Sequence, residues 1–120
     1  MKSENPRIEW SEKSGKQCLR FTFGEMLTGK EAEIAIAEWR EAFESKTDES
    51  IVLIWDCRKM KGYESAARTK WTEALKKLKP QIDTIWLISD STLIRMGASV
   101  MSMLSSINIQ PVSSEGEIAA

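Results

Sequence analysis

Two stretches of the chain share one pattern, in which a continuous apolar run is followed by an acidic residue and then by an amphipathic segment. The first reads Ile51-Val-Leu-Ile-Trp-Asp56 and leads to residues 63–79; the second reads Thr84-Ile-Trp-Leu-Ile-Ser-Asp90 and leads to residues 92–104. Continuous apolar runs are typical of strands that are buried on both faces of a sheet. The pattern therefore predicts an α/β fold in which strands and helices alternate.

The N-terminal half is interpreted as a hairpin followed by a helix. Residues 7–10 are a predicted short strand, and a polar turn separates them from residues 18–23, where apolar side chains alternate as in a half-buried strand. Thr28 with Glu31 three positions later is a capping box, which predicts a helix to about residue 45. Its apolar face, which includes the predicted core anchor Trp39, consists of Ala32, Ala35, Ile36, Trp39, Ala42 and Phe43.

The C-terminal half predicts two further helices and two further strands. Pro80 ends the second helix, and Ser91 or Thr92 caps the third. A short strand follows near residues 107–112 and is an edge strand because it contains a proline. The order ββαβαβαβ, with right-handed crossovers, predicts a mixed, mostly parallel sheet of about five strands with three to four helices. We expect residues 1–120 to form a single domain, whose tail, 113–120, either starts a last helical turn or frays.

Composition excludes several classes of function. The 17 basic and 18 acidic residues nearly cancel, so the chain has no strong field for nucleic acid. Histidine is absent, which removes the commonest general base and metal ligand, and we expect no metal site and no cofactor. Cys18 and Cys57 lack CxxC spacing and no apolar signal segment opens the chain, which favours a cytoplasmic protein with free thiols. Its longest apolar runs are far shorter than the roughly 20 residues of a membrane-spanning helix, so we expect no transmembrane segment.

Charge is distributed unevenly along the chain. Residues 58–79 hold eight basic side chains against two acidic ones, a net charge of +6, whereas residues 25–49 hold three against eight, a net charge of −5. A basic second helix beside an acidic first helix indicates either attraction within the fold or a polarised surface for a charged partner.

The order of elements resembles the STAS-like superfamily. The residues that carry the resemblance are Gly24-Glu-Met-Leu-Thr28, which lead into the first helix, and Val52-Leu-Ile-Trp-Asp56, which lead into the second. Within the superfamily the chain is most similar to SpoIIAA-like proteins, also described as STAS/SEC14-like. The resemblance covers nearly the whole chain and implies a non-enzymatic regulatory or protein-interaction module, because anti-sigma factor antagonists of this superfamily bind a partner kinase and are switched by phosphorylation.

The phosphorylation motif of that superfamily is altered here. It has the form Asp-Ser-Ser-Gly at the start of the helix after the strand that corresponds to residues 51–56, and the matching stretch is Glu64-Ser65-Ala66-Ala67. The position that is usually phosphorylated falls on Ala66. Ser65 serves as the phosphorylation site if the loop alignment shifts by one residue. The SEC14-like branch of the resemblance implies instead a lipid in an apolar pocket.

We predict the candidate site at the carboxyl ends of the parallel strands, where ligands of open α/β sheets bind. Two loops meet there, and their predicted recognition residues are Asp56, Cys57, Tyr63, Glu64, Asp90, Ser91, Thr92 and Arg95. Alternatively, the acids and hydroxyls bond only to their own turns and caps. A paired-acid or thiol enzyme that uses Asp56, Asp90 or Cys57 ranks below both readings, and we predict no catalytic residue.

The third predicted helix carries more apolar surface than one sheet face requires. Apolar side chains occupy well over half of its circumference and leave a narrow polar arc. We predict that part of the helix is an interface or lines an apolar pocket, with Ile94, Met96, Met101 and Met103 as the candidates. The alternative is that the C-terminal tail covers it.

The leading interpretation is therefore a cytoplasmic regulatory module that binds a partner protein, a second copy of itself, or both. The alternative is a carrier that binds a small apolar ligand or a lipid in a pocket beside the third helix. An enzyme is the least favoured reading.

Overall fold

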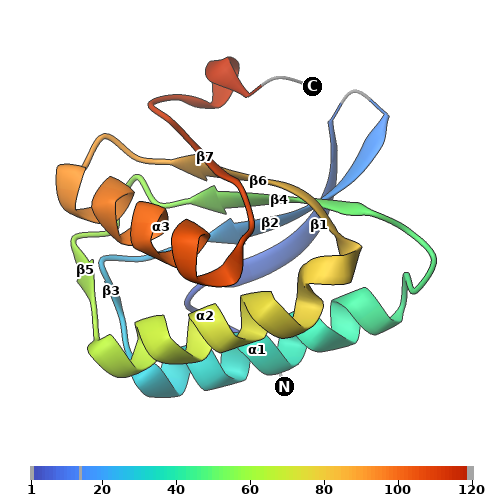
Figure 1. Ribbon diagram of the computed structural model, residues 1–120, viewed down its shortest axis with the longest axis horizontal. Coiled ribbons are helices and arrows are strands. Elements are labelled where there is room, and N and C mark those ends of the chain that lie inside the picture. Colours follow the sequence, from blue (N-terminus) through green and yellow to red (C-terminus); the bar gives the residue numbers. More distant parts are fainter. Residues whose placement is uncertain (1, 14, 119–120) are drawn as a thin grey trace.

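A five-stranded sheet is the centre of the computed structural model, which describes residues 2–13 and 15–118. Its strands lie in the order β1 (Arg7–Lys13), β2 (Lys16–Thr22), β4 (Ile51–Asp56), β6 (Ile82–Ile88) and β7 (Ile109–Val112) (Figure 1). β1 is antiparallel to β2, and the other neighbours are parallel. The predicted hairpin, the mostly parallel sheet and the edge position of the last strand are confirmed.

Three helices cover one face of this sheet: α1 (Gly29–Glu44), α2 (Ser65–Leu78) and α3 (Thr92–Ser105) (Figure 1). They share a face because the three crossovers move in one direction across the sheet, from β2 to β4, β6 and β7, and right-handed crossovers then place each helix on the same side. The first helix begins with the predicted capping box, in which Thr28 and Glu31 bond to each other's backbone N–H. Short 3₁₀ turns follow at Lys79–Gln81 and Glu115–Glu117.

An aromatic cluster fills the space between the helices and the sheet. Trp39, the predicted core anchor, is fully buried. Its ring centroid lies 5.3 Å from that of Phe21 on β2, nearly perpendicular to it, and 5.3 Å from that of Trp71 on α2. Trp55 on β4 adds a further edge contact at 6.0 Å from Trp71. Such contacts fix the helices against the sheet at defined angles.

The opposite face of the sheet carries a smaller apolar cluster beneath the C-terminal segment. Ile118 is buried there against a group that comprises Cys18, Val52, Ile54, Trp86, Ile88 and Val112. Of the two outcomes left open for the tail, the structure shows a short 3₁₀ turn at Glu115–Glu117, on the side of the sheet away from the helices. For residues 113–118 the alternative that the tail covers the third helix is wrong, because Ile118 packs on the opposite face of the sheet; residues 119–120 of the predicted tail lie outside the described residues.

Two short strands were not anticipated from the sequence. β3 (Met26–Leu27) and β5 (Gly62–Tyr63) form a separate parallel pair that links the starts of α1 and α2. The backbone N–H of Glu64 also donates to the carbonyl of Leu27 at 2.9 Å. This pairing keeps Tyr63 out of the helix that was predicted to include it and holds it at the strand-end edge of the sheet.

Candidate functional site

The two predicted loops lie together at one edge of the sheet. β4 and β6 are parallel and in register from Val52 with Thr84 to Asp56 with Ile88, so both strands end at the same level. The backbone N–H of Cys57 then donates to the carbonyl of Ile88 at 2.9 Å. The starts of α2 and α3 therefore face the same edge, as expected for open parallel sheets.

Asp56 belongs to an ion-pair network on the sheet face away from the helices. Its carboxylate accepts hydrogen bonds from Arg20 at 2.8 Å and from the Arg58 side chain at 2.7 and 2.9 Å. The backbone N–H of Arg58 donates to it as well, at 3.2 Å. Glu115 bonds Arg20 in turn, at 2.9 and 3.0 Å. The bonds from Arg58 lower the pKa of Asp56 to about 2, with a smaller contribution from Arg20, so the carboxylate is held ionised by internal partners.

Cys57 points the other way, into the helix side of the sheet. Its side chain is buried. Burial, and secondly the charge of Asp56, raise the pKa of its thiol far above the usual range, so the reactive thiolate is disfavoured. Of the two neighbours predicted at the recognition edge, one is an ion-paired structural acid and the other lines the interior.

The second loop is organised by its own hydroxyls. The hydroxyl of Ser91 caps α3 by accepting from the N–H of Ile94 at 3.3 Å. Arg95 folds back to donate to the carbonyl of Ser89 at 2.7 Å and to the hydroxyl of Ser113 at 3.0 Å. Asp90 and Thr92 are exposed and remain available at the surface.

The start of α2 lies against the start of α1. Glu64 stands at the N-cap position of α2 but does not cap it, because its carboxylate accepts from the backbone N–H of Gly29 at 2.7 Å. A side chain at Gly29 would be 3.1 Å from the Cβ of Ala66. Ser65, the predicted phosphorylation position, is the first residue of α2 and is exposed.

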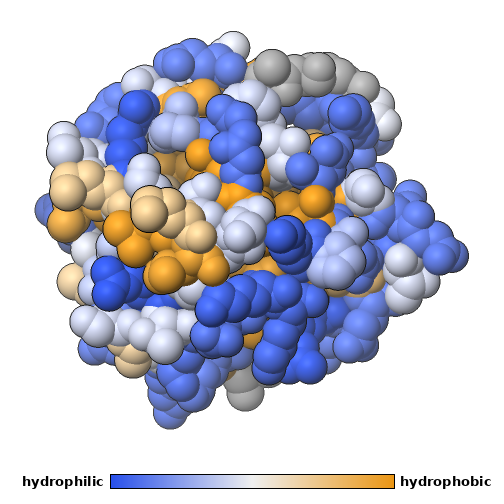
Figure 2. Space-filling view, in the orientation of Figure 1, coloured by the Kyte–Doolittle hydropathy of each residue, from blue (hydrophilic) through white to orange (hydrophobic). Residues whose placement is uncertain are grey.

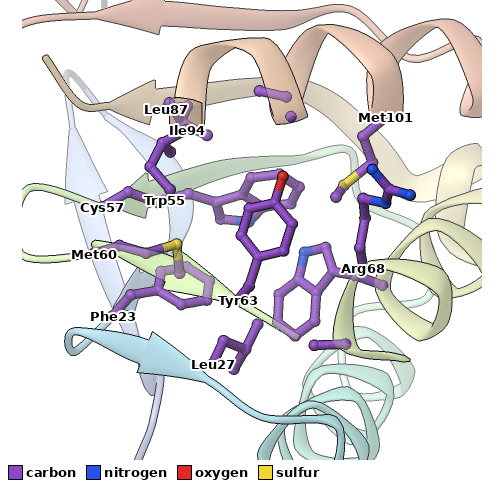
Figure 3. A pocket seen from close by; sticks show the side chains of 14 residues that line it. Phe23, Leu27, Trp55, Cys57, Met60, Tyr63, Arg68, Leu87, Ile94 and Met101 are labelled. Atoms are coloured by element: carbon purple, nitrogen blue, oxygen red, sulfur yellow. The ribbon is translucent and has the colours of Figure 1, made fainter. Parts of the chain in front are cut away.

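An apolar pocket lies between α2, α3 and the ends of the strands (Figure 3). Its volume is about 460 Å³, which includes space that is open to solvent. Arg68 is the one charged residue in its lining, which consists of Phe23, Leu27, Trp55, Cys57, Met60, Tyr63, Ala67, Arg68, Trp71, Leu87, Ile94, Gly97, Ala98 and Met101. The indole Nε1 of Trp55 is buried without a hydrogen-bond partner in the described part of the chain, as is that of Trp39 in the core.

Tyr63 crosses the pocket from β5 to α3. Figure 3 shows its ring in front of Trp55 with the hydroxyl directed toward the helix. A Cβ atom placed on Gly97 would overlap that hydroxyl oxygen. Glycine inside a helix costs about 1 kcal/mol relative to alanine, so the close approach of Tyr63 explains why a glycine stands at this point of α3.

The outward side of α3 carries an exposed apolar stripe. Five side chains that are 42–81% exposed make up this α3 stripe: Leu93, Met96, Val100, Met103 and Leu104. Figure 2 shows the hydrophobic colouring gathered over this helix, beside a hydrophilic band over α2. The buried face of the same helix is formed by different residues, Ile94, Ala98 and Ser105.

The four residues predicted for an interface or pocket on the third helix divide between these two features. Ile94 and Met101 line the pocket, whereas Met96 and Met103 lie on the α3 stripe, 63% and 81% exposed. The aromatic walls Phe23, Trp55 and Trp71 were not identified as pocket residues from the sequence. A signal was present in Gly97, a glycine inside an otherwise apolar helix, which indicates a close contact.

The described residues, 2–13 and 15–118, contain no cluster of three or more metal-ligating side chains. Nor do they include a helix with the length and apolar character needed to cross a membrane.

Comparison with known proteins identifies the architecture. No protein-family model matches the sequence, and the search of curated proteins found no match. Among solved structures, the chain is similar to an uncharacterized protein of the DUF3478 family with a SpoIIAA-like fold from Shewanella loihica PV-4. The TM-score is 0.79 at 14% sequence identity, and the match covers 94% of this chain and 90% of the other. The resemblance inferred from the sequence is confirmed at the level of the fold: this chain is an α/β protein with a SpoIIAA-like fold.

Proposed function

We propose that this protein is a non-enzymatic regulatory module that binds a partner protein through the α3 stripe. The observation that carries the proposal is the exposure of five large apolar side chains on one helix that has a separate buried face. Contiguous apolar patches of this kind on soluble proteins mark interaction sites. Since the core is complete without the stripe, its apolar character is explained by a partner rather than by folding.

The spacing of the stripe fits a helical partner. Leu93, Met96, Val100 and Met103 follow one another at intervals of three, four and three residues, which is the spacing of residues that pack against another helix. Methionine side chains, two of the five, adapt to irregular surfaces. Helix-in-groove recognition uses such a surface, and the exposed Asp90 and Thr92 extend it toward the strand-end edge.

The chemistry of the strand-end loops supports binding over catalysis. An enzyme with Asp56 as a general base requires a carboxylate that is free to take a proton near neutral pH, but two arginines hold the pKa of Asp56 at about 2. An enzyme with Cys57 as a nucleophile requires an accessible thiolate, but burial raises the pKa of this thiol.

Ser65 remains the predicted position of a regulatory phosphate. Its exposed hydroxyl lies in the first turn of α2, where a phosphate gains from the positive end of the helix dipole. Intact-mass and fragment-mass spectrometry of protein isolated from its source, under several growth conditions, tests this prediction. Ser65 unmodified in every sample contradicts it.

Substitutions on the stripe test the proposed function. Met96→Glu with Met103→Glu places two charges on the stripe, and the matched control, Thr47→Glu with Ser50→Glu, places two charges on exposed positions of the loop between α1 and β4. In quantitative affinity purification from the source organism, we expect a partner that co-purifies with the wild type and with the loop control to fall at least about tenfold with the stripe variant. Equal recovery by all three proteins, or recovery of no partner, contradicts the proposal, and light scattering of the same samples separates a second copy from a different protein.

A second candidate function is the binding of a small apolar ligand or a lipid chain in the pocket. The specific observation in its favour is the nearly all-apolar lining with one cation, Arg68, beside Met101 at one side (Figure 3). An amphiphile with an acidic head group matches that arrangement.

Native mass spectrometry distinguishes this second function. A carrier retains extra mass after purification, and Met101→Trp, which narrows the pocket, removes that mass. Met103→Trp is the matched control, since Met103 does not line the pocket. A wild-type protein free of bound mass after incubation with oleate contradicts the carrier function.

A further inference from the structure

The flank of α2 that faces α3 is basic. The residues Ala67, Trp71 and Leu75 lie on the buried face of α2. Because a helix has 3.6 residues per turn, the exposed residues of α2 form one flank on each side of this buried face. One flank faces α1, because Lys70 pairs with Glu33 of α1 at 2.6 Å. The other flank carries the exposed Arg68 and Lys76, and the exposed Lys79 follows directly after the end of α2. This flank faces α3, since Arg68 lines the pocket together with Met101 (Figure 3).

The α3 stripe lies on the side of α3 that is turned toward this flank. Gly97 contacts Tyr63, two residues before the start of α2, and Gly97 lies between the buried face of α3 and the stripe on the helical projection. The stripe and the basic flank therefore border the same surface, with the pocket mouth between them. We call this the α2–α3 surface, with one apolar side on α3 and one basic side on α2.

The described residues offer the basic side few acidic partners. Within the described residues Arg68 and Lys79 form no salt bridge, and the only ion pair of Lys76 is a 3.5 Å contact with Glu73 between exposed side chains. The single charge within α3 is Arg95, which is turned toward Ser89 and Ser113. Each of the two helices has one acidic residue close to its start in the sequence. For α3 this residue is Asp90, and for α2 it is Glu64, whose carboxylate is bonded to the backbone N–H of Gly29.

We infer that the α2–α3 surface binds an amphipathic helix whose apolar stripe is flanked by acidic residues. This inference rests on the proposed function and adds the chemistry of the partner. The apolar contacts with the stripe supply most of the affinity, because ion pairs between exposed side chains contribute little each. The basic flank selects the partner and its orientation, since a basic helix in the same place brings like charges together.

A second copy of this chain is a poorer occupant. Residues 92–105 contain no acidic side chain, so an α3 helix from another copy offers an apolar stripe but leaves Arg68, Lys76 and Lys79 unpaired. Charge complementarity therefore favours a different protein with an acidic helix.

Selection from a displayed library of helical peptides tests the inference. The library varies the polar positions of an amphipathic helix with a fixed leucine stripe, and the wild-type protein is the target. We expect the selected peptides to be enriched in Glu and Asp on one flank. The affinity of these peptides should be about tenfold or more lower for the variant Arg68→Glu/Lys76→Glu/Lys79→Glu than for the wild type. The affinity for the wild type should also fall about tenfold or more when the NaCl concentration is raised from roughly 0.05 to 0.5 M, since salt screens exposed charges.

Two variants make the result specific. Arg7→Glu/Lys16→Glu/Arg40→Glu changes the net charge equally at exposed positions away from α3, and binding should stay within about twofold of wild type. Met96→Glu should abolish binding. Circular dichroism confirms that each variant is folded.

The outcomes separate this inference from the proposed function. Peptides that depend on Met96 but show no acidic preference, or bind the triple-Glu variant as well as wild type, overturn the inference and leave the proposed function standing. Peptides that bind independently of Met96, or no selected peptide at all, overturn both. Two further outcomes overturn the inference. If the protein forms concentration-dependent dimers that are lost in Met96→Glu, the occupant of the surface is another copy of this chain. If the protein adsorbs to phosphatidylglycerol vesicles but binds no peptide, the occupant is a lipid surface.

Discussion

At the scale of single residues, Asp56 shows how far local sequence can place a side chain. The sequence correctly puts it at the end of a buried strand, and its turn contact with Arg58 is also local. The rest of the network is distant in the sequence. Arg20 lies 36 positions from Asp56, and Glu115, which bonds to Arg20, lies 95 positions from that arginine. The side of the sheet on which they meet depends on strand pairing and on the path of the tail, which the local pattern does not determine.

The network predicts a specific loss of stability in acid. Because the pKa of Asp56 is lowered in the folded state, from the usual 3.8 to about 2, its contribution to the free energy of unfolding is present above about pH 4 and is lost as the pH falls toward 2. Linkage puts that contribution at roughly 2 kcal/mol. Asp56→Asn should therefore narrow the difference in unfolding free energy between pH 7 and pH 2.5 by about that amount in urea titrations. An unchanged difference contradicts the network, and Asp48→Asn, in an exposed loop, controls for the lost charge.

Gly97 provides a second prediction at this scale. Alanine normally stabilises a helix by about 1 kcal/mol over glycine, but a Cβ here meets the hydroxyl of Tyr63, so Gly97→Ala should destabilise the protein by about 1 kcal/mol or more. In a Tyr63→Ala background the same substitution should be stabilising. A double-mutant cycle measured by urea unfolding detects this change of sign. Additive effects of the two substitutions would show that the contact is not the reason for the glycine.

At the scale of elements, the sequence predicts what depends on neighbours in the chain. The capping box of α1 and the Ser91 cap of α3 are local bonds, and both are found. The excess apolar surface of α3 was also correctly read. Its division between pocket and exposed stripe needed the structure, because residues on both sides of the helix are equally apolar and only the packing of α3 against Tyr63, α2 and the sheet distinguishes them.

The division of α3 has a measurable consequence for stability. Met96→Gln and Met103→Gln lie on the exposed stripe, so each should change the free energy of unfolding by no more than about 0.5 kcal/mol. Ile94→Ala, on the buried face of the same helix, should cost about 2–5 kcal/mol. Chemical denaturation followed by tryptophan fluorescence gives both values. A large loss from either Gln substitution means that the stripe is part of the folding core.

At the scale of the whole molecule, the two faces of the sheet are closed in different ways. Alternating apolar runs and amphipathic segments were enough to predict the α/β order and the strand-end edge, because crossover handedness limits the topology. The position of residues 113–118 on the open face was not predicted, since it depends on Glu115 reaching Arg20 and Ile118 reaching Val52 and Ile54 across the sheet. As far as residues 2–13 and 15–118 are described, this arrangement leaves the outward side of α3 exposed.

Site-specific photo-crosslinking in living cells of the source organism tests most directly whether that free surface binds a partner protein. A photoreactive phenylalanine derivative replaces Met96 or Met103 on the α3 stripe and, as a control, the exposed Thr47 in the loop before β4. We predict that the two stripe positions crosslink to the same protein, different from this chain, and that position 47 gives little of that product. Equal crosslinking at all three positions, or none at the stripe, would contradict the assignment of α3 as the recognition surface.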